Sequence, residues 1–236
     1  MISSDRATIK QLLAETEERE SVTIYGWVRT RRDSKAFSFL EINDGSCLGS
    51  IQVIIDASIE TYEAVKTINT GASVKVLGRL VESPGKGQDW EIQAQELNLI
   101  GAAPEDYPLQ KKRHSDEFLR TIAHLRGRTN KYGAIFRIRS RLSYAIHQFF
   151  QNRGFNYIHT PIITGSDCEG AGDMFRVTGF ELTKVPQSNG VVNFEDEFFG
   201  KEEHLTVSGQ LAVENYCLAL GRFTTFGPTS TSENPN

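Results

Sequence analysis

The residues best suited to substrate chemistry lie in the last third of the chain, where polar residues separate a strand pattern from a helix pattern. Leu205 and Val207 alternate as in a strand, and Ser208-Gly209-Gln210 follow directly. Apolar residues then recur at helical spacing over 211–219, and Glu214 lies on that helix. Hydroxyl, amide and carboxylate groups at a strand end favour binding of a small polar substrate, although an ordinary β-α-β packing unit has the same pattern.

An acidic, glycine-rich loop precedes this region. Residues 166–175 read SDCEGAGDMF, in which two glycines flank Ala171 and Glu169 and Asp173 carry negative charge. Such a loop suits capture of an ammonium group. Surface Glu-Gly loops without a ligand are also common, so the loop alone is weak support for a site.

A second set of candidate residues lies on strands in the first hundred residues. Side-chain alternation places Phe37 and Phe39 on one face of the 36–43 run, and Gln52 opposite the apolar residues of the 50–56 run. We expect these three side chains outside, beside Arg29, Arg31 and Arg32, with Leu40, Ile42, Ile51, Val53 and Ile55 inside. Aromatic rings flanked by arginines stack single-stranded bases, and an amide offers a base edge both a donor and an acceptor. The alternative is that one phenylalanine belongs to the core.

Five β-prone runs must position these residues. Turn signals separate them, and one short helix, Ser58–Asn69, lies between the third and fourth. Another short helix is expected over Thr8–Glu17. This order is typical of the five-stranded oligonucleotide-binding (OB) barrel, which we expect over residues 1–103. The five runs are Val22–Arg29, Ala36–Asn43, Ser50–Asp56, Ser73–Glu82 and Trp90–Ile100.

The rest of the chain reads as a basic linker and an α/β domain. We expect the linker over 104–130 and the second domain over 131–236. That domain begins with an amphipathic helix, Tyr132–Arg153, followed by a strand, Phe155–Ile163. Pro161 cannot donate to a β-ladder, so it marks a sheet edge or a strand end.

Composition bounds the class of protein. The net charge is −4, yet residues 111–141 hold ten Lys and Arg against two acidic residues. A basic belt on an acidic body favours a polyanionic partner, although a solvated helix face gives the same pattern. Three widely spaced cysteines indicate reduced thiols, and we expect no metal site. No apolar run approaches the ~20 residues of a membrane span, so we expect a cytoplasmic protein without a membrane partner.

Several longer motifs resemble asparaginyl-tRNA synthetases, class II enzymes of the aspartyl/asparaginyl branch. VSGQL, ALGR and FGPT carry the resemblance near the C-terminus, YPLQKKRHSDEFLR in the linker, and GWVRTRRDS, FLEINDGS and IQV in the barrel. The resemblance implies an anticodon-binding OB barrel followed by the first part of a class II antiparallel-sheet catalytic domain. It also implies ATP-dependent activation of L-asparagine with Mg²⁺, transfer to tRNA(Asn), and a homodimer.

The resemblance assigns roles to individual residues. In the barrel, Phe39 stacks an anticodon base and Gln52 recognises another, with Arg29 beside them. In the second domain, Glu169 contacts the α-ammonium group of the amino acid and Pro161 lies in the dimer-forming motif 1. Further expected site residues are Ser208, Gln210 and Glu214 for the amino acid and Glu233 in the catalytic motif 2.

One position bears on the choice of amino acid. Aspartyl enzymes carry a lysine on the helix after the strand end, and the matching position here is Val213, followed by Glu214. A buried carboxylate without a cation is costly, whereas a neutral amide can donate to Glu214. The pattern therefore favours asparagine over aspartate.

The resemblance breaks at the C-terminus. Thr231 stands where motif 2 carries its ATP-binding arginine, and the glycine-rich motif 3 with a second arginine has no counterpart. The chain is therefore expected to stop within motif 2. Three interpretations stay open: an asparagine–tRNA ligase, a catalytically inactive derivative that binds tRNA through its barrel, and an oligonucleotide-binding protein unrelated to aminoacylation.

Overall fold

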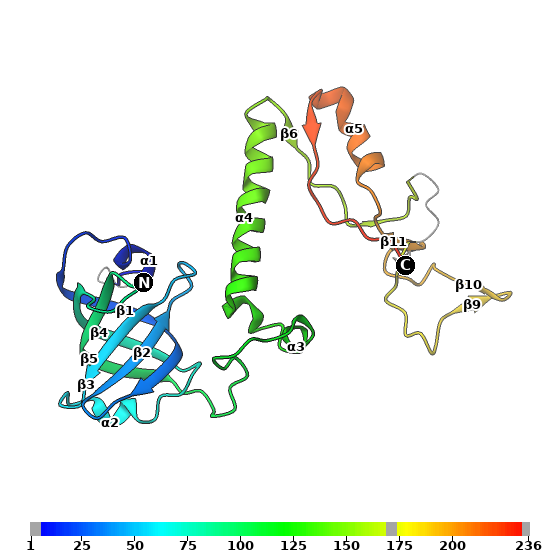
Figure 1. The fold of residues 1–236 in the computed structure, drawn as a ribbon. Coiled ribbons are helices and arrows are strands. Elements are labelled where there is room, and N and C mark those ends of the chain that lie inside the picture. The colour runs from blue at the N-terminus through cyan, green and yellow to red at the C-terminus, as the bar shows by residue number, and fades with distance from the viewer. Residues whose placement is uncertain (1–5, 169–173, 233–236) are drawn as a thin grey trace. The chain divides into compact units, whose positions relative to one another are not determined.

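The computed structural model describes residues 6–168 and 174–232 (Figure 1). The chain forms two compact units, Met1–Arg139 and Ser140–Asn236, which we call the N-terminal and C-terminal units. The sequence-based boundaries at 103 and 130 remain a prediction.

The N-terminal unit is built on a closed five-stranded barrel. Its strands are β1 (Arg19–Asp33), β2 (Phe37–Asn43), β3 (Ile51–Asp56), β4 (Ser73–Glu82) and β5 (Trp90–Gly101). They close in the order β1-β2-β3-β5-β4, and only the β3–β5 pairing is parallel. The predicted OB barrel is confirmed, with β1 extending four residues past its predicted end.

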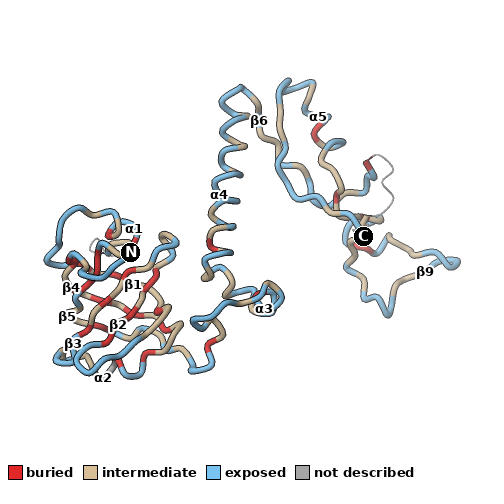
Figure 2. Tube along the Cα trace, viewed as in Figure 1, coloured by how far each residue is buried: buried red, intermediate tan, exposed pale blue. Residues whose placement is uncertain are grey.

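Figure 2 shows buried positions recurring along the barrel strands, and most of these buried residues are apolar. The five predicted interior residues, Leu40, Ile42, Ile51, Val53 and Ile55, are fully buried. The short helix α1 (Ile9–Leu12) closes one part of this core, because its Ile9 and Leu12 side chains belong to the same cluster. Two glycines allow close strand approach: a Cβ at Gly26 would lie 2.6 Å from the Asn43 carbonyl oxygen, and one at Gly78 would lie 2.3 Å from that of Gln93.

Both helices predicted in this unit are shorter than expected. The capping box of Thr8 and Gln11 starts α1, which ends at Leu12 instead of residue 17. The predicted 58–69 helix is reduced to α2 (Tyr62–Val65). The Asp56 carboxylate accepts hydrogen bonds from the backbone N–H and hydroxyl of Ser58, and this local turn competes with a helix start.

The predicted linker packs on the barrel. It contains α3 (Asp116–Thr121), a 3₁₀ turn at Arg126–Arg128, and the start of α4 (Asn130–Gln151). The Tyr107 ring fills the space beside Gly71, and Arg137 donates from Nη2 to the Gly45 and Cys47 carbonyls. Residues 107–137 are therefore fixed against the barrel.

The C-terminal unit contains the end of α4, short strands and one further helix. Three strands, β7 (Ile163–Thr164), β11 (Glu203–Leu205) and β8 (Arg176–Val177), form an antiparallel sheet in the order β7-β11-β8. The parallel pair is β6 (Asn156–Tyr157) with β12 (Phe223–Thr224), and the hairpin is β9 (Gln187–Ser188) with β10 (Val191–Val192).

One prediction for this unit needs correction, whereas the predicted Tyr132–Arg153 helix is confirmed as α4. The predicted Phe155–Ile163 strand is interrupted between β6 and β7, and the exposed Pro161 lies in the gap, where its missing N–H removes a ladder donor. The apolar stripe of α4 is only partly covered within the described residues, since Ile138, Leu142 and Phe149 are more than half exposed. Helix α5 (Gln210–Leu220) contains the predicted helical run over 211–219 and ends at Gly221, whose φ is +68°.

Candidate nucleic-acid interface and amino-acid site

The outer face of β2 and β3 carries the predicted aromatic and amide side chains. Phe37 is 38% exposed, and Phe39 and Gln52 are half-buried. The predicted facing of these three residues is confirmed. Neither phenylalanine is among the fully buried core residues, so the alternative of a core phenylalanine is wrong.

Phe39 lies against an arginine. The Arg32 guanidinium carbon is 4.7 Å from the centre of the Phe39 ring, within the range of a cation–π contact. Arg32 and Phe39 are paired across β1 and β2, so the sheet register itself creates this contact. A planar cation and an aromatic ring on one outward face form a platform on which a base can stack.

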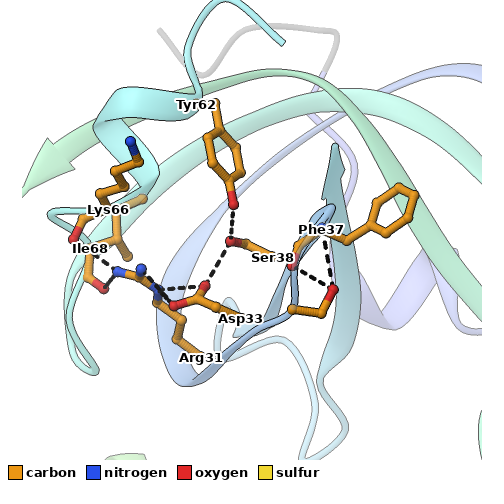
Figure 3. A network of polar contacts seen from close by, with 8 residues as sticks. Arg31, Asp33, Phe37, Ser38, Tyr62, Lys66 and Ile68 are labelled. Atoms are coloured by element: carbon orange, nitrogen blue, oxygen red, sulfur yellow. Dashed lines mark hydrogen bonds and ion pairs between the residues drawn. The ribbon is translucent and has the colours of Figure 1, made fainter. Parts of the chain in front are cut away.

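The sequence placed Arg31 on the same face as Phe39. In the structure, Arg31 binds other groups of the protein and not the open face. Figure 3 shows its guanidinium enclosed between Asp33 and the loop after α2. Its Nε and Nη2 donate to the Asp33 carboxylate at 2.7–3.0 Å, and its Nη1 donates to the Lys66 and Ile68 carbonyls. The donors of Arg31 are therefore largely satisfied, and its expected place beside the bases needs correction.

The same network closes the β1–β2 end of the barrel. The buried Ser38 hydroxyl donates to Asp33 at 2.7 Å and lies 3.1 Å from the Tyr62 hydroxyl (Figure 3). The hydrogen bonds from Arg31, reinforced by Ser38, hold the pKa of Asp33 below its ordinary value. Asp33 thus holds the side chain of Arg31, the residue that precedes Arg32 on β1.

A row of polar side chains crosses the outer face. The register pairs Thr30 with Glu41, Glu41 with Gln52, and Gln52 with Glu91. The Thr30 hydroxyl donates to Glu41 at 3.1 Å, and Gln52 Nε2 donates to Glu91 at 3.3 Å. With its amide nitrogen directed to Glu91, Gln52 offers its carbonyl oxygen to a ligand N–H group.

Glu91 is a hydrogen-bond partner of the candidate site residue Gln52 that the sequence reasoning missed. Its side chain is only 3% exposed, and its Oε2 accepts from Ser83, Gln88 and Gln52. The available signal was a glutamate between Trp90 and Ile92 at the start of a β-prone run, where alternation alone predicts no polar cluster.

Arg29 lies away from this platform, toward the basic segment. Its Nη1 donates to Asn130 at 2.8 Å. It lines a pocket between the barrel and residues 107–131, which also contains Thr30 and Glu41. Arg29 therefore directly precedes Thr30, the first residue of the polar row. It lies beside the cations that line this pocket.

The second candidate site lies at the start of α5. Ser208 Oγ accepts from the Gln210 N–H at 3.1 Å, and Gln210 Nε2 donates to Glu214 at 2.8 Å. The buried Cys168 thiol lies 3.9 Å from Gln210 Oε1. The structure thus brings together the three predicted side chains, and the Cys168 contact brings the segment before Glu169 to the same helix.

The structure describes only some of the other positions predicted for this site. Val213 is 4% exposed, so an apolar side chain is buried at the position that the resemblance matched to the lysine of aspartyl enzymes. The Ser230 N–H donates to the Thr206 carbonyl, which places the residue before Thr231 beside the strand end. Glu169 and Glu233 lie outside the described residues. Within the described ranges, no group of His, Cys, Asp and Glu is arranged to hold a metal ion.

Comparison with known families gives two matches. Residues 22–100 match the OB-fold nucleic acid binding domain, and residues 115–222 match the tRNA synthetases class II (D, K and N). The first match covers nearly all of the closed barrel, and the second includes the Ser208–Glu214 candidate site.

Individual relatives agree with these matches. The chain is 60% identical over 98% of its length to the asparagine–tRNA ligase of Nitratidesulfovibrio vulgaris, and 57% identical to that of Lawsonia intracellularis, in each case over 50% of the relative. It thus spans about half the length of the curated relatives it matches. In fold, it resembles the asparaginyl-tRNA synthetase of Pyrococcus horikoshii complexed with asparaginyl-adenylate, with a TM-score of 0.80 and 24% identity over 99% of this chain and 49% of that one. Over nearly its whole length the chain is therefore similar to asparaginyl-tRNA synthetases, and its residues 115–222 match the class II (D, K and N) family of tRNA synthetases.

Proposed function

We propose that this chain serves the ATP-dependent ligation of L-asparagine to tRNA(Asn), and that its barrel recognises the tRNA anticodon. The observation that carries the proposal is the outward platform of Phe39 and Arg32, one strand from the Gln52 amide. A base stacked on Phe39 gains roughly 1–3 kcal/mol, and the Gln52 carbonyl selects an edge that presents an N–H group.

The C-terminal unit supplies part of the amino-acid site. In this proposal, Ser208, Gln210 and Glu214 contact asparagine, and Glu169 binds its ammonium group. Glu214 carries the accepting carboxylate for the side-chain amide, and the buried Val213 leaves no lysine there to neutralise an aspartate. One relative in fold is a complex with asparaginyl-adenylate, which supports ATP as the activating substrate.

The wider setting follows from the same proposal. ATP enters with Mg²⁺, Glu233 belongs to the catalytic motif 2, and ligation occurs in the cytoplasm with the rest of translation. Within the described residues, no helix is long and apolar enough to cross a membrane. The exposed apolar stripe of α4 and the exposed Pro161 fit a homodimer contact.

Binding of tRNA tests the recognition step. In a fluorescence anisotropy titration at fixed salt, the chain is expected to bind a tRNA(Asn) transcript at least about tenfold tighter than an unrelated tRNA. Equal affinity for both transcripts would contradict anticodon recognition.

A second candidate function is tRNA binding without catalysis. Thr231 at the motif 2 arginine position favours it, because a hydroxyl cannot supply the positive charge that stabilises a reacting phosphate. Asparagine-dependent exchange of pyrophosphate into ATP separates the two functions. Exchange by the purified chain supports the ligase, whereas specific tRNA binding without exchange supports the second candidate for this chain.

A further inference from the structure

A pocket of about 570 Å³ lies in the N-terminal unit between the β1–β2 surface and the 107–131 segment. The barrel contributes Trp27, Arg29, Thr30 and Glu41 to its lining, and the segment contributes a run of cations at 111–113. Its size is in the range that holds one small ligand or one nucleotide. The proposed function places no ligand in this pocket.

The charge of the pocket favours an anion. Six Lys and Arg side chains line it against the single carboxylate of Glu41. Three of these cations already have partners: Arg29 with Asn130, Lys131 with Asp116, and Arg128 with the Tyr107 hydroxyl and the Trp27 ring.

The other three cations are available to a ligand. Lys111, Lys112 and Arg113 are exposed, and their side chains make no ion pair or hydrogen bond with any described residue. Like charges held together without a counterion raise the local positive potential, and a phosphate group relieves it.

The polar row connects this pocket to the base-reading face. Thr30 and Glu41 line the pocket, and Glu41 is the direct cross-strand neighbour of Gln52. Neighbouring strands lie about 4.8 Å apart, so a base at Gln52 and a group at Glu41 are within the reach of consecutive nucleotides of one strand. The Glu41 carboxylate only accepts hydrogen bonds, and so it selects a base edge that presents N–H donors.

We propose that this pocket binds the nucleotide adjacent to the one read by Gln52, with its phosphate on the Lys111–Arg113 run and its base edge donating to Glu41. The inference rests on the proposed function, because the same RNA strand supplies both nucleotides. It makes Glu41 a specificity-determining residue and gives the basic run a defined position on the RNA, at the anticodon loop.

The test uses the full chain and two RNA probes: a tRNA(Asn) transcript and its isolated anticodon stem–loop. The double variant Lys112→Ala/Arg113→Ala is expected to weaken binding of both probes by the same factor. It should also reduce the salt dependence, the slope of log K against log salt, by roughly 0.7 for the loss of one single-stranded phosphate contact. Lys75→Ala, which removes a cation on β4 outside the pocket, should leave the slope unchanged. A stem–loop that binds the double variant as tightly as the wild type would overturn the proposal, because the cations would then contact another part of the tRNA.

The variant Glu41→Gln tests the base contact. It keeps the side-chain length but turns an acceptor pair into one donor and one acceptor. Its affinities for stem–loops substituted at the nucleotide beside the Gln52 base should change rank by at least about tenfold between the best and worst base. A uniform change for all four bases would contradict a base contact at Glu41.

A free nucleotide is the other source of the same chemistry. Adenosine monophosphate is expected not to displace the stem–loop. Displacement that Lys112→Ala/Arg113→Ala abolishes would reassign the pocket to a mononucleotide and overturn the RNA assignment. Failure of the proposed function and failure of this inference give different results. If the wild-type chain shows no preference for the tRNA(Asn) probes, both are contradicted. If the preference is retained and the variants bind like the wild type, only this inference is contradicted.

Discussion

The two units of this chain differ in how completely they bury their apolar residues. The barrel strands are six to fifteen residues long, and the whole buried core cluster lies between Ile9 and Leu97. The strands of the C-terminal unit are two or three residues long. Among its described residues, only Cys168 and Val213 are buried apolar side chains, and Leu218, Phe198 and Leu182 are almost fully exposed.

The difference shows where this chain has a rigid scaffold. A closed barrel satisfies its strand edges and its core within one short stretch of sequence, so it can hold Phe39 and Gln52 in place without other segments. Short strands with exposed apolar faces have low local stability. The proposed recognition of RNA by the barrel is therefore expected to depend less on the second unit than the proposed amino-acid site does.

Native-state hydrogen exchange gives the largest expected contrast. Amides of β4 and β5 should exchange only on global unfolding, and those of β8 and β11 should exchange more than about a thousandfold faster through local opening. Exchange measured by mass spectrometry on the whole chain reports both sets together. Comparable protection in β11 and β4 would show that the C-terminal unit is as stable as the barrel.

Side-chain truncation should lower the free energy of unfolding by about 3 kcal/mol more in the barrel core than on the exposed surface of the C-terminal unit. Leu40→Ala empties space in a fully buried position and is expected to lower the free energy of unfolding by roughly 2–5 kcal/mol. The matched change Leu218→Ala, at a fully exposed position, should stay within about 0.5 kcal/mol. Far-UV circular dichroism in a urea titration follows both units, and the fluorescence of Trp27 and Trp90, which both lie in the barrel, identifies the barrel transition. Equal effects of the two substitutions would erase the distinction between the units.

A smaller effect is expected at the barrel end. Asp33→Asn removes a carboxylate that accepts from Arg31 and Ser38, and should cost about 1 kcal/mol at pH 7. Because the folded pKa of Asp33 is lowered, its contribution is complete above the unfolded value of about 3.9 and is lost as pH falls through the folded pKa. The stability difference between variant and wild type should therefore shrink below about pH 4, measured by urea titrations across pH. A difference that grows on acidification would contradict this sign.

Local patterns predicted the barrel well, because strand alternation and turn residues act within a few positions. They placed Leu40 inside and Phe39 outside correctly. They overestimated the 58–69 helix, since the Asp56–Ser58 turn depends on one side-chain geometry. Arg31 was misplaced for a related reason: its carbonyl partners are 35 and 37 residues away, and periodicity carries no information on such contacts.

For the candidate sites, motif resemblance added what periodicity did not. It identified Ser208, Gln210 and Glu214 as candidate site residues, and the structure places them in one hydrogen-bonded group. It did not reveal Glu91, whose role depends on the parallel pairing of β3 with β5. Parallel register between distant strands is set by the tertiary fold, so a single sequence shows it poorly.

The outward platform of the barrel is the central claim, and one pair of substitutions tests it most directly. Phe39→Ala should weaken binding of the tRNA(Asn) anticodon stem–loop by roughly 5–150-fold, the loss of one stacked base. Phe37→Ala removes an equally large ring from the same strand face, without the arginine contact, and should change affinity less than about threefold. Anisotropy titrations of both variants at one salt concentration give the comparison. Unchanged affinity in Phe39→Ala, or an equal loss in both variants, would contradict a base-stacking site at Phe39.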